Sequence, residues 1–271
     1  MTKKMIMFMI LIIFLLPYWW MFTYSLEPAT AAMSPKPRLL PKTITFDNYL
    51  YMFRLAHFPK WVFNSIFIPG MAVILTCLSA SMAGYVLAKK DFPGGRFIFL
   101  LMIATMAIPT NTILIPRFLV MKKLGLLNTY PSMFLLYMAK PFGVFLMKQI
   151  ISTLPDEMLE AARIDGASEW QTFWLMVVPL ARPGIIALGM FTFVACYGDY
   201  FWQLLMTKTV EMRTLPLAIE YFRQGTDVST YSPKLQLIMA AALLASLPLL
   251  VLYGLFHRYF VEGPSTGSLK G

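Results

Sequence analysis

Residues 160–168 read Glu-Ala-Ala-Arg-Ile-Asp-Gly-Ala-Ser, a polar, acid-bearing stretch between long apolar segments. In the whole chain of 271 residues, 58% are hydrophobic and only 13% are charged. Soluble domains carry about a quarter charged residues, so the composition indicates an integral membrane protein. A polar element within so apolar a chain indicates a place where another molecule docks.

The apolar segments predict an all-α membrane protein. Several approach the roughly 20 residues that a helix needs to cross the hydrocarbon core, and the alternating pattern of barrel strands is absent. We expect six transmembrane helices, with a polar two-helix hairpin at about 154–178 between the fourth and the fifth. The six segments span roughly 5–26, 64–88, 97–118, 131–150, 184–206 and 235–256. An even number of helices places both termini on one side of the membrane.

The first segment allows two interpretations. A cleaved signal peptide is one, because Ala29-Thr30-Ala31 resembles a cleavage site. The apolar core is, however, longer than the about 7–15 residues of a signal, and it ends in Trp19-Trp20, which is typical of a membrane interface. We therefore predict a retained helix. The predicted organisation is a first transmembrane helix at 1–26, a proline-rich outer connector at 27–61, a helical core at 62–258 and a tail at 259–271.

The formal net charge of +10 comes from basic residues scattered through the loops. A nucleic-acid-binding protein would concentrate such charge in a basic run, so we expect charge that flanks the membrane, contact with lipid, and no nucleic acid. The basic residues divide almost evenly between the two predicted sides. The preference of lysine and arginine for the inner side therefore leaves the orientation open.

The hairpin opens with a helix-start signal at residues 153–157, with Thr153 as the candidate cap, an early proline and acids in the first turn. The first helix is expected to run from Glu157 to about Asp165. Helical spacing predicts one face with Glu157, Glu160 and Ala161, and another with Leu154, Met158 and Ala162. Glu160 and Arg163 lie three residues apart, a spacing that allows a weak ion pair.

A glycine turn and a second helix complete the hairpin. Gly166 lies where a left-handed residue ends a helix, and Ser168-Glu169-Trp170-Gln171 is a capping-box sequence. Pro179 and Pro183 are expected to end the second helix. An apolar stripe follows helical spacing at Trp170, Phe173, Trp174 and Val177. A solvated hairpin is the alternative to a docking element, although the small Ala161 and Ala162 permit a partner to approach closely.

The whole stretch, with Phe173 and Pro179-Leu180 downstream, resembles the EAA loop of ABC-transporter membrane subunits (permeases). It is most similar to the carbohydrate-importer type, such as the shorter, six-helix permease of maltose systems. Further matches follow in the family's order along nearly the whole chain, at residues 46–49, 61–65, 115–116, 125–126, 128–130, 213–217 and 267–271.

The resemblance implies a cytoplasmic coupling hairpin that sits in a cleft of an ATPase subunit, and a bacterial inner-membrane protein with both termini in the cytoplasm. It implies as partners a homologous second permease subunit, an ABC ATPase dimer, an extracytoplasmic solute-binding protein and a sugar substrate. The residues that it assigns to ATPase coupling are Glu157, Glu160, Ala161, Ala162, Asp165, Gly166 and Ser168.

Reactive groups are missing from the sequence. It contains no Gly-x-x-x-x-Gly-Lys-Ser/Thr phosphate loop, and His57 and His257 are isolated residues outside any metal or nucleophile spacing. We therefore expect that the chain is no enzyme and holds no cofactor or metal. ATP and Mg²⁺ would be bound by the partner ATPase subunits.

Polar residues at membrane depth are candidates for a substrate pathway. Asp199 is flanked by Tyr197, Tyr200 and Trp202, and aromatic rings beside a hydrogen-bonding acid suit a sugar ring. An interfacial aromatic belt is the alternative. The family usually has Trp-Asn before this acid, whereas this chain has Tyr197-Gly198, so the family's substrate detail does not transfer.

Lys140 is the second pathway candidate. Its alternative role is to pair with a carbonyl group near the kink that Pro141 predicts. A lysine in the pathway would favour an acidic oligosaccharide. We also expect Pro109 and Pro116 to kink the third segment.

These observations predict a permease subunit of an ATP-driven, binding-protein-dependent importer, which forms half of the translocation pathway for a sugar or oligosaccharide. A permease for another solute, such as glycerol phosphate, is the close alternative. A secondary transporter would carry buried coupling acids and inverted repeats, and one candidate acid without a visible repeat disfavours it.

Overall fold

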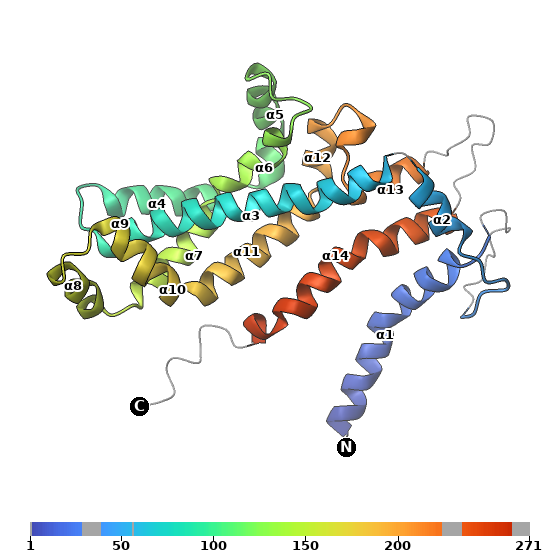
Figure 1. Ribbon diagram of the computed structural model, residues 1–271, viewed down its shortest axis with the longest axis horizontal. Coiled ribbons are helices and arrows are strands. Elements are labelled where there is room, and N and C mark those ends of the chain that lie inside the picture. The colour runs from blue at the N-terminus through green and yellow to red at the C-terminus, as the bar shows by residue number, and fades with distance from the viewer. Residues whose placement is uncertain (1, 29–38, 56, 224–234, 262–271) are drawn as a thin grey trace. The chain divides into compact units, whose positions relative to one another are not determined.

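The computed structural model describes residues 2–28, 39–55, 57–223 and 235–261, and over these residues the regular elements are all helices (Figure 1). The predicted all-α class is therefore confirmed. Three sequence features lie outside the described residues: the candidate cleavage site at 29–31, the motif at 267–271 and most of the predicted tail.

The chain divides into two compact units, and the first contains Met1–Ile66 and Thr209–Val251. Its elements are α1 (Thr2–Ser25), α2 (Asp47–Arg54), the first turns of α3 (Phe58–Lys89), the 3₁₀ turn η3 (Val210–Met212), α13 (Leu215–Arg223) and most of α14 (Leu235–Val261). Trp61 is buried in its core, where the indole meets the rings of Tyr221 and Phe222 edge-on. Ala240 and Ala241 of α14 pack into the same cluster.

Side chains at the start of α3 hold the segment that precedes α13. The Trp61 indole N–H donates to the carbonyl oxygen of Val210 at 2.7 Å. The Asn64 amide donates to the carbonyl oxygens of Glu211 and Arg213, at 2.8 and 2.9 Å. These bonds fix the backbone around η3 to the start of α3, and they join two of the motifs that carry the family resemblance.

The second unit contains Phe67–Lys208 and Leu252–Gly271. It starts with the rest of α3 and ends, before the last part of α14, with α11 (Arg182–Tyr197) and α12 (Tyr200–Met206). Between them lie α4 (Gly95–Met106), the 3₁₀ turn η1 (Thr110–Ile113), α5 (Leu114–Lys123), α6 (Tyr130–Met138) and α7 (Pro141–Ser152). The predicted hairpin forms α8 (Asp156–Ile164), α9 (Glu169–Thr172), the π-helical turn η2 (Phe173–Val177) and α10 (Val178–Leu180).

Three helices in the described residues are long and apolar enough to cross a membrane: Lys4–Ser25, Phe58–Lys89 and Leu235–Phe256. The count reaches five if each of two bent pairs is one span. These pairs are α6 with α7, bent by 43°, and the α9–α10 stretch with α11, bent by 77°. The apolar α4 has only 12 residues, so the six-helix count stays a prediction.

Proline explains some of the breaks. The third predicted segment is interrupted at Pro109, which is extended and precedes η1. Pro116, however, lies in the first turn of α5, where the missing N–H costs no helical bond. The predicted kink at Pro116 is therefore wrong. The break between α6 and α7 places Lys140 at the helix start, directly before Pro141.

Candidate functional site

The turn of the hairpin has the geometry that its glycine predicts. Gly166 has a φ of +84°, a conformation that side-chain-bearing residues rarely adopt. The Gly166 N–H donates to the carbonyl oxygen of Arg163 at 3.1 Å, and the Ala167 N–H donates to that of Ala162 at 2.9 Å. These two bonds make a Schellman motif, which satisfies the last carbonyl groups of α8.

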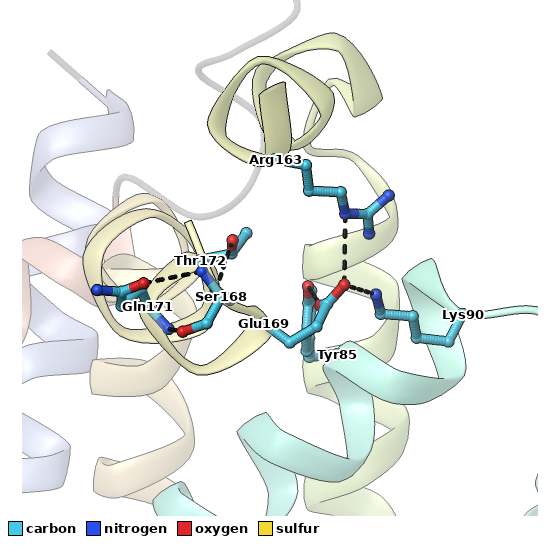
Figure 2. Close-up of polar contacts among 7 residues, drawn as sticks. All are labelled: Tyr85, Lys90, Arg163, Ser168, Glu169, Gln171 and Thr172. Atoms are coloured by element: carbon cyan, nitrogen blue, oxygen red, sulfur yellow. Dashed lines mark hydrogen bonds and ion pairs between the residues drawn. The ribbon is translucent and has the colours of Figure 1, made fainter. Parts of the chain in front are cut away.

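The capping box at the start of α9 is also confirmed (Figure 2). The Ser168 hydroxyl accepts a bond from the Gln171 N–H at 3.3 Å, and the Gln171 side-chain oxygen accepts one from the Ser168 N–H at 2.8 Å. The Thr172 hydroxyl donates to the carbonyl oxygen of Ser168 at 3.0 Å. Together these bonds fix where the second helix begins and hence where Glu169 points.

One local prediction for the first helix, the Thr153 cap, is wrong. The Thr153 hydroxyl donates to the carbonyl oxygen of Ile150 and ends α7, while Pro155 occupies the cap position of α8 without a side-chain bond. The buried face is centred on Leu159, whereas Met158 is exposed. Leu159 is the residue that reaches the apolar cluster formed with α3, α7 and α9–α11, and its burial contributes about 2 kcal/mol.

Two of the four residues in the apolar stripe predicted for the second helix are buried and two are exposed. Phe173 and Val177 are buried, but Trp170 and Trp174 are exposed. The chain forms a π-helical turn over Phe173–Val177, and the exposed Trp170 and Trp174 rings lie 6.3 and 5.2 Å from the Phe173 ring. Only half of the predicted stripe therefore packs against the rest of the unit.

Glu169 connects three elements (Figure 2). Its carboxylate accepts a 2.8 Å hydrogen bond from the Tyr85 hydroxyl and a bond from the Lys90 ammonium. The Arg163 guanidinium lies 3.4 Å away. The i, i+3 spacing suggested that Arg163 pairs with Glu160. In the described structure Arg163 pairs with Glu169 instead.

The α9–α10 stretch that Glu169 opens is bent by 77° against α11. The Lys90 ammonium attracts the Glu169 carboxylate across their hydrogen bond. Because half of this side chain is exposed, solvent screens the attraction.

Lys89 anchors the other end of the hairpin. Its ammonium donates to the carbonyl oxygen of Leu154 at 2.6 Å and to the carboxylate of Asp156 at 2.7 Å. The lysine side chain is only 5% exposed. Sequence reasoning missed this contact and the one to Lys90, although the adjacent lysines were visible as basic residues next to a predicted helix.

The seven predicted coupling residues share one region of the hairpin. Six are exposed and Ala162 is half-buried. Ile164, at the end of α8, is 86% exposed, and Trp170 and Leu175 are exposed as well. The hairpin therefore presents apolar side chains beside acidic ones. This arrangement suits a partner that buries both kinds of group.

The structure brings both pathway candidates together around Tyr137. The Tyr137 hydroxyl donates to the Asp199 carboxylate at 2.6 Å, and the Lys140 ammonium lies 4.1 Å from the centre of the Tyr137 ring. Asp199 also caps α12 by accepting the Trp202 N–H at 3.1 Å. Sequence reasoning did not identify Tyr137, although Lys140 lies only three residues further along the chain.

The aromatic pathway candidates differ in exposure. Tyr197 and Trp202 are buried, and the Trp202 indole donates to the carbonyl oxygen of Ser132 at 2.9 Å. Tyr200 is half-buried and packs edge-on against Phe201. Contact between any of these rings and a sugar stays a prediction.

The chain is similar to known proteins over most of its length. A family described as "Binding-protein-dependent transport system inner membrane component" matches residues 80–264. The Arabinooligosaccharides transport system permease protein AraQ of Halalkalibacterium halodurans is 33% identical over 250 residues, which cover 91% of this chain and 88% of that protein. The Trehalose transport system permease protein SugB of Mycobacterium tuberculosis is 31% identical over 259 residues, which cover 95% and 93%.

A solved structure has a similar fold. It is a chain of a bacterial ABC transporter involved in the import of the acidic polysaccharide alginate, and it superposes with a TM-score of 0.84. The match covers 96% of this chain and 95% of that chain, at 22% sequence identity. At this identity the likeness concerns the fold alone.

Proposed function

Because this chain belongs to the family of binding-protein-dependent transport system inner membrane components, we propose that it is a permease subunit of an ATP-driven importer for a sugar or oligosaccharide. The family and the apolar helices make it a multi-pass protein of the inner membrane. Relatives named as permeases for arabinooligosaccharides and trehalose support a carbohydrate substrate.

The exposed hairpin is the observation that carries this proposal. The hairpin exposes Ile164, Trp170 and Leu175, and several large apolar side chains exposed on one polar element favour a surface that a partner covers. Here Ile164 is 86% exposed beside the exposed carboxylates of Glu160 and Asp165. We propose that these groups dock into a cleft of a separate ATPase subunit.

The mechanism needs shape and rigidity rather than reactive groups in this chain. ATP and Mg²⁺ would be bound by the ATPase dimer, whose closure would displace the docked hairpin in the cytoplasm. Rigid-body motion of the hairpin would then change the packing of the helices joined to it, as in other bistable transport proteins. A homologous second permease would form the other half of the pathway, and both termini would be cytoplasmic.

Solute delivery would come from the opposite side. An extracytoplasmic binding protein would present the sugar, as the family description indicates for its members. Lys140 lies at the break between α6 and α7, where a cation would favour an acidic oligosaccharide.

Reconstitution in proteoliposomes with the cognate ATPase, second permease and binding protein tests the proposal. We expect no ATPase activity from this chain alone, and activity of the full complex that rises with the sugar-loaded binding protein. Glu160→Lys or Gly166→Pro should abolish that rise while the chain still inserts in the membrane. Arg96→Glu, a charge reversal of equal size at an exposed residue outside the hairpin, is the control and should retain it. Full stimulation of the Glu160→Lys and Gly166→Pro complexes would contradict the docking role.

A further inference from the structure

Two consecutive lysines at the end of α3 reach opposite ends of the hairpin. Lys89 bonds to the Leu154 carbonyl and the Asp156 carboxylate, where α8 begins. Lys90 bonds to the Glu169 carboxylate, where α9 begins. Two contacts at separate points fix the orientation of the hairpin relative to α3, whereas a single contact would allow the hairpin to rotate about it.

The chain itself joins the hairpin to other helices. Leu154 and Pro155 lead into it directly from α7, and Ala181 connects it to α11 at the 77° bend. By contrast, α3 ends at Lys89, more than 60 residues before α8 begins. Its attachment to the hairpin is therefore made only by side chains.

An apolar contact supports the polar one. The Tyr85 ring lies 5.7 Å from that of Phe173, and both rings belong to the buried cluster that also contains Leu159. The same Tyr85 hydroxyl donates to Glu169 at 2.8 Å. Tyr85 thus contributes to both parts of the attachment, with its ring in the cluster and its hydroxyl at the charged edge.

Glu169 receives more positive charge than a simple surface pair would provide. Tyr85 and Lys90 approach it from the end of α3, and Arg163 approaches it from α8 (Figure 2). The Glu169 carboxylate at the start of α9 therefore contacts both the end of α8 and the end of the spanning helix α3. The capping box holds the backbone of Glu169 in place for these contacts.

We propose that the Lys90–Glu169 contact, with Lys89–Asp156 as its second arm, is a joint that passes displacement of the hairpin to the spanning helix α3. This inference rests on the proposed docking of the hairpin. It adds the contacts through which motion of the hairpin would reach α3. Lys90 and Glu169 are positioning residues, since they touch neither ATP nor the solute. Exposed ion pairs contribute little to folding stability, so the main effect of breaking this one falls on coupling.

A charge-reversal cycle tests the joint in the full reconstituted complex. The variants are Lys90→Glu, Glu169→Lys and the double swap, and the readout is the number of sugar molecules transported per ATP hydrolysed. We expect each single variant to lower this ratio by roughly two- to fivefold, the range that one exposed pair supports. The double swap should restore part of it, because the charges at positions 90 and 169 attract again although position 169 then repels the Arg163 guanidinium.

Co-purification of the ATPase with the permease is the second readout, and it should be unchanged in all three variants. Single variants with the ratio of the wild type, or a double swap as poor as the singles, would overturn the inference. If the reversed charges prevent insertion, Lys90→Gln and Glu169→Gln replace them with the same expected loss, and an unchanged ratio again overturns it.

The Glu160→Lys complex separates this test from that of the proposed function. If Glu160→Lys retains stimulated ATPase activity, the docking proposal itself fails. If Glu160→Lys loses that activity while Lys90→Glu transports with the ratio of the wild type, docking stands and only the joint is refuted.

Discussion

The Tyr137 hydroxyl of α6 donates a 2.6 Å hydrogen bond to the Asp199 carboxylate, which also caps α12. Both partners are removed from bulk water at least in part, and a lost bond there leaves a polar group unsatisfied. We expect Tyr137→Phe to destabilise the protein by about 1–3 kcal/mol. Thermal unfolding in detergent measures this, with Tyr51→Phe, an exposed tyrosine of α2, as the control that should leave Tm unchanged.

A substitution of Asp199 separates its structural role from a role in the pathway. Asparagine also caps helices well and can accept the Tyr137 hydroxyl, so Asp199→Asn should unfold within a few degrees of the wild type. If the carboxylate binds the solute, transport by Asp199→Asn should nevertheless fall at least about tenfold, the effect of losing one charged hydrogen bond. Transport at the rate of the wild type would assign Asp199 to helix capping alone.

The close approach of α3 and α7 at Gly84 predicts that a larger residue there lowers the stability of the protein. A Cβ atom on Gly84 would lie 2.8 Å from the backbone nitrogen of Lys148 and from the Cβ of Met147. Neither atom is the end of a flexible side chain, so Gly84→Ala should cost about 1–3 kcal/mol. Gly70→Ala, in the same helix with nothing within 4 Å, is the matched control. Equal melting temperatures for the two variants would contradict this packing.

Substitution of Gly166 tests the backbone conformation of the turn, because there is room for a side chain at this position. A Cβ atom would meet nothing within 4 Å, but φ is +84°. Gly166→Ala should therefore cost about 1 kcal/mol through the backbone alone. Gly166→Asn should recover part of this loss, since asparagine tolerates the left-handed conformation better. Measurement of Tm for both variants would show a larger fall for alanine; the reverse order would reject the assignment.

Sequence-local features of the hairpin were predictable. The glycine turn and the capping box depend on residues within five positions of one another, so the sequence around Gly166 and Ser168 predicts their conformations directly. The break at Lys140-Pro141 follows from proline in the same way. The family resemblance extended these local signals to an all-α permease fold, which the structural comparison supports.

Contacts between distant segments were not predictable. The partner of Lys90 lies 79 residues along the chain, and nothing near Glu169 in sequence indicates it. Burial of Leu159 depends on how residues of α3 and α7 pack against α8. The π-helical turn in the second helix likewise has no signal in the sequence. Arg163 likewise had a local candidate partner in Glu160, but the turn brings Glu169 closer.

We propose that the hairpin docks onto a separate ATPase. Photo-crosslinking measures this most directly, with p-benzoylphenylalanine in place of Ala161 in the membrane-embedded complex. Ala161 is exposed on α8, so the account predicts a crosslink to the ATPase subunit whose yield changes with ATP. The same probe at Val251, exposed on the apolar α14, should give none. Absence of an ATPase crosslink from position 161 in an assembled, active complex would contradict the account.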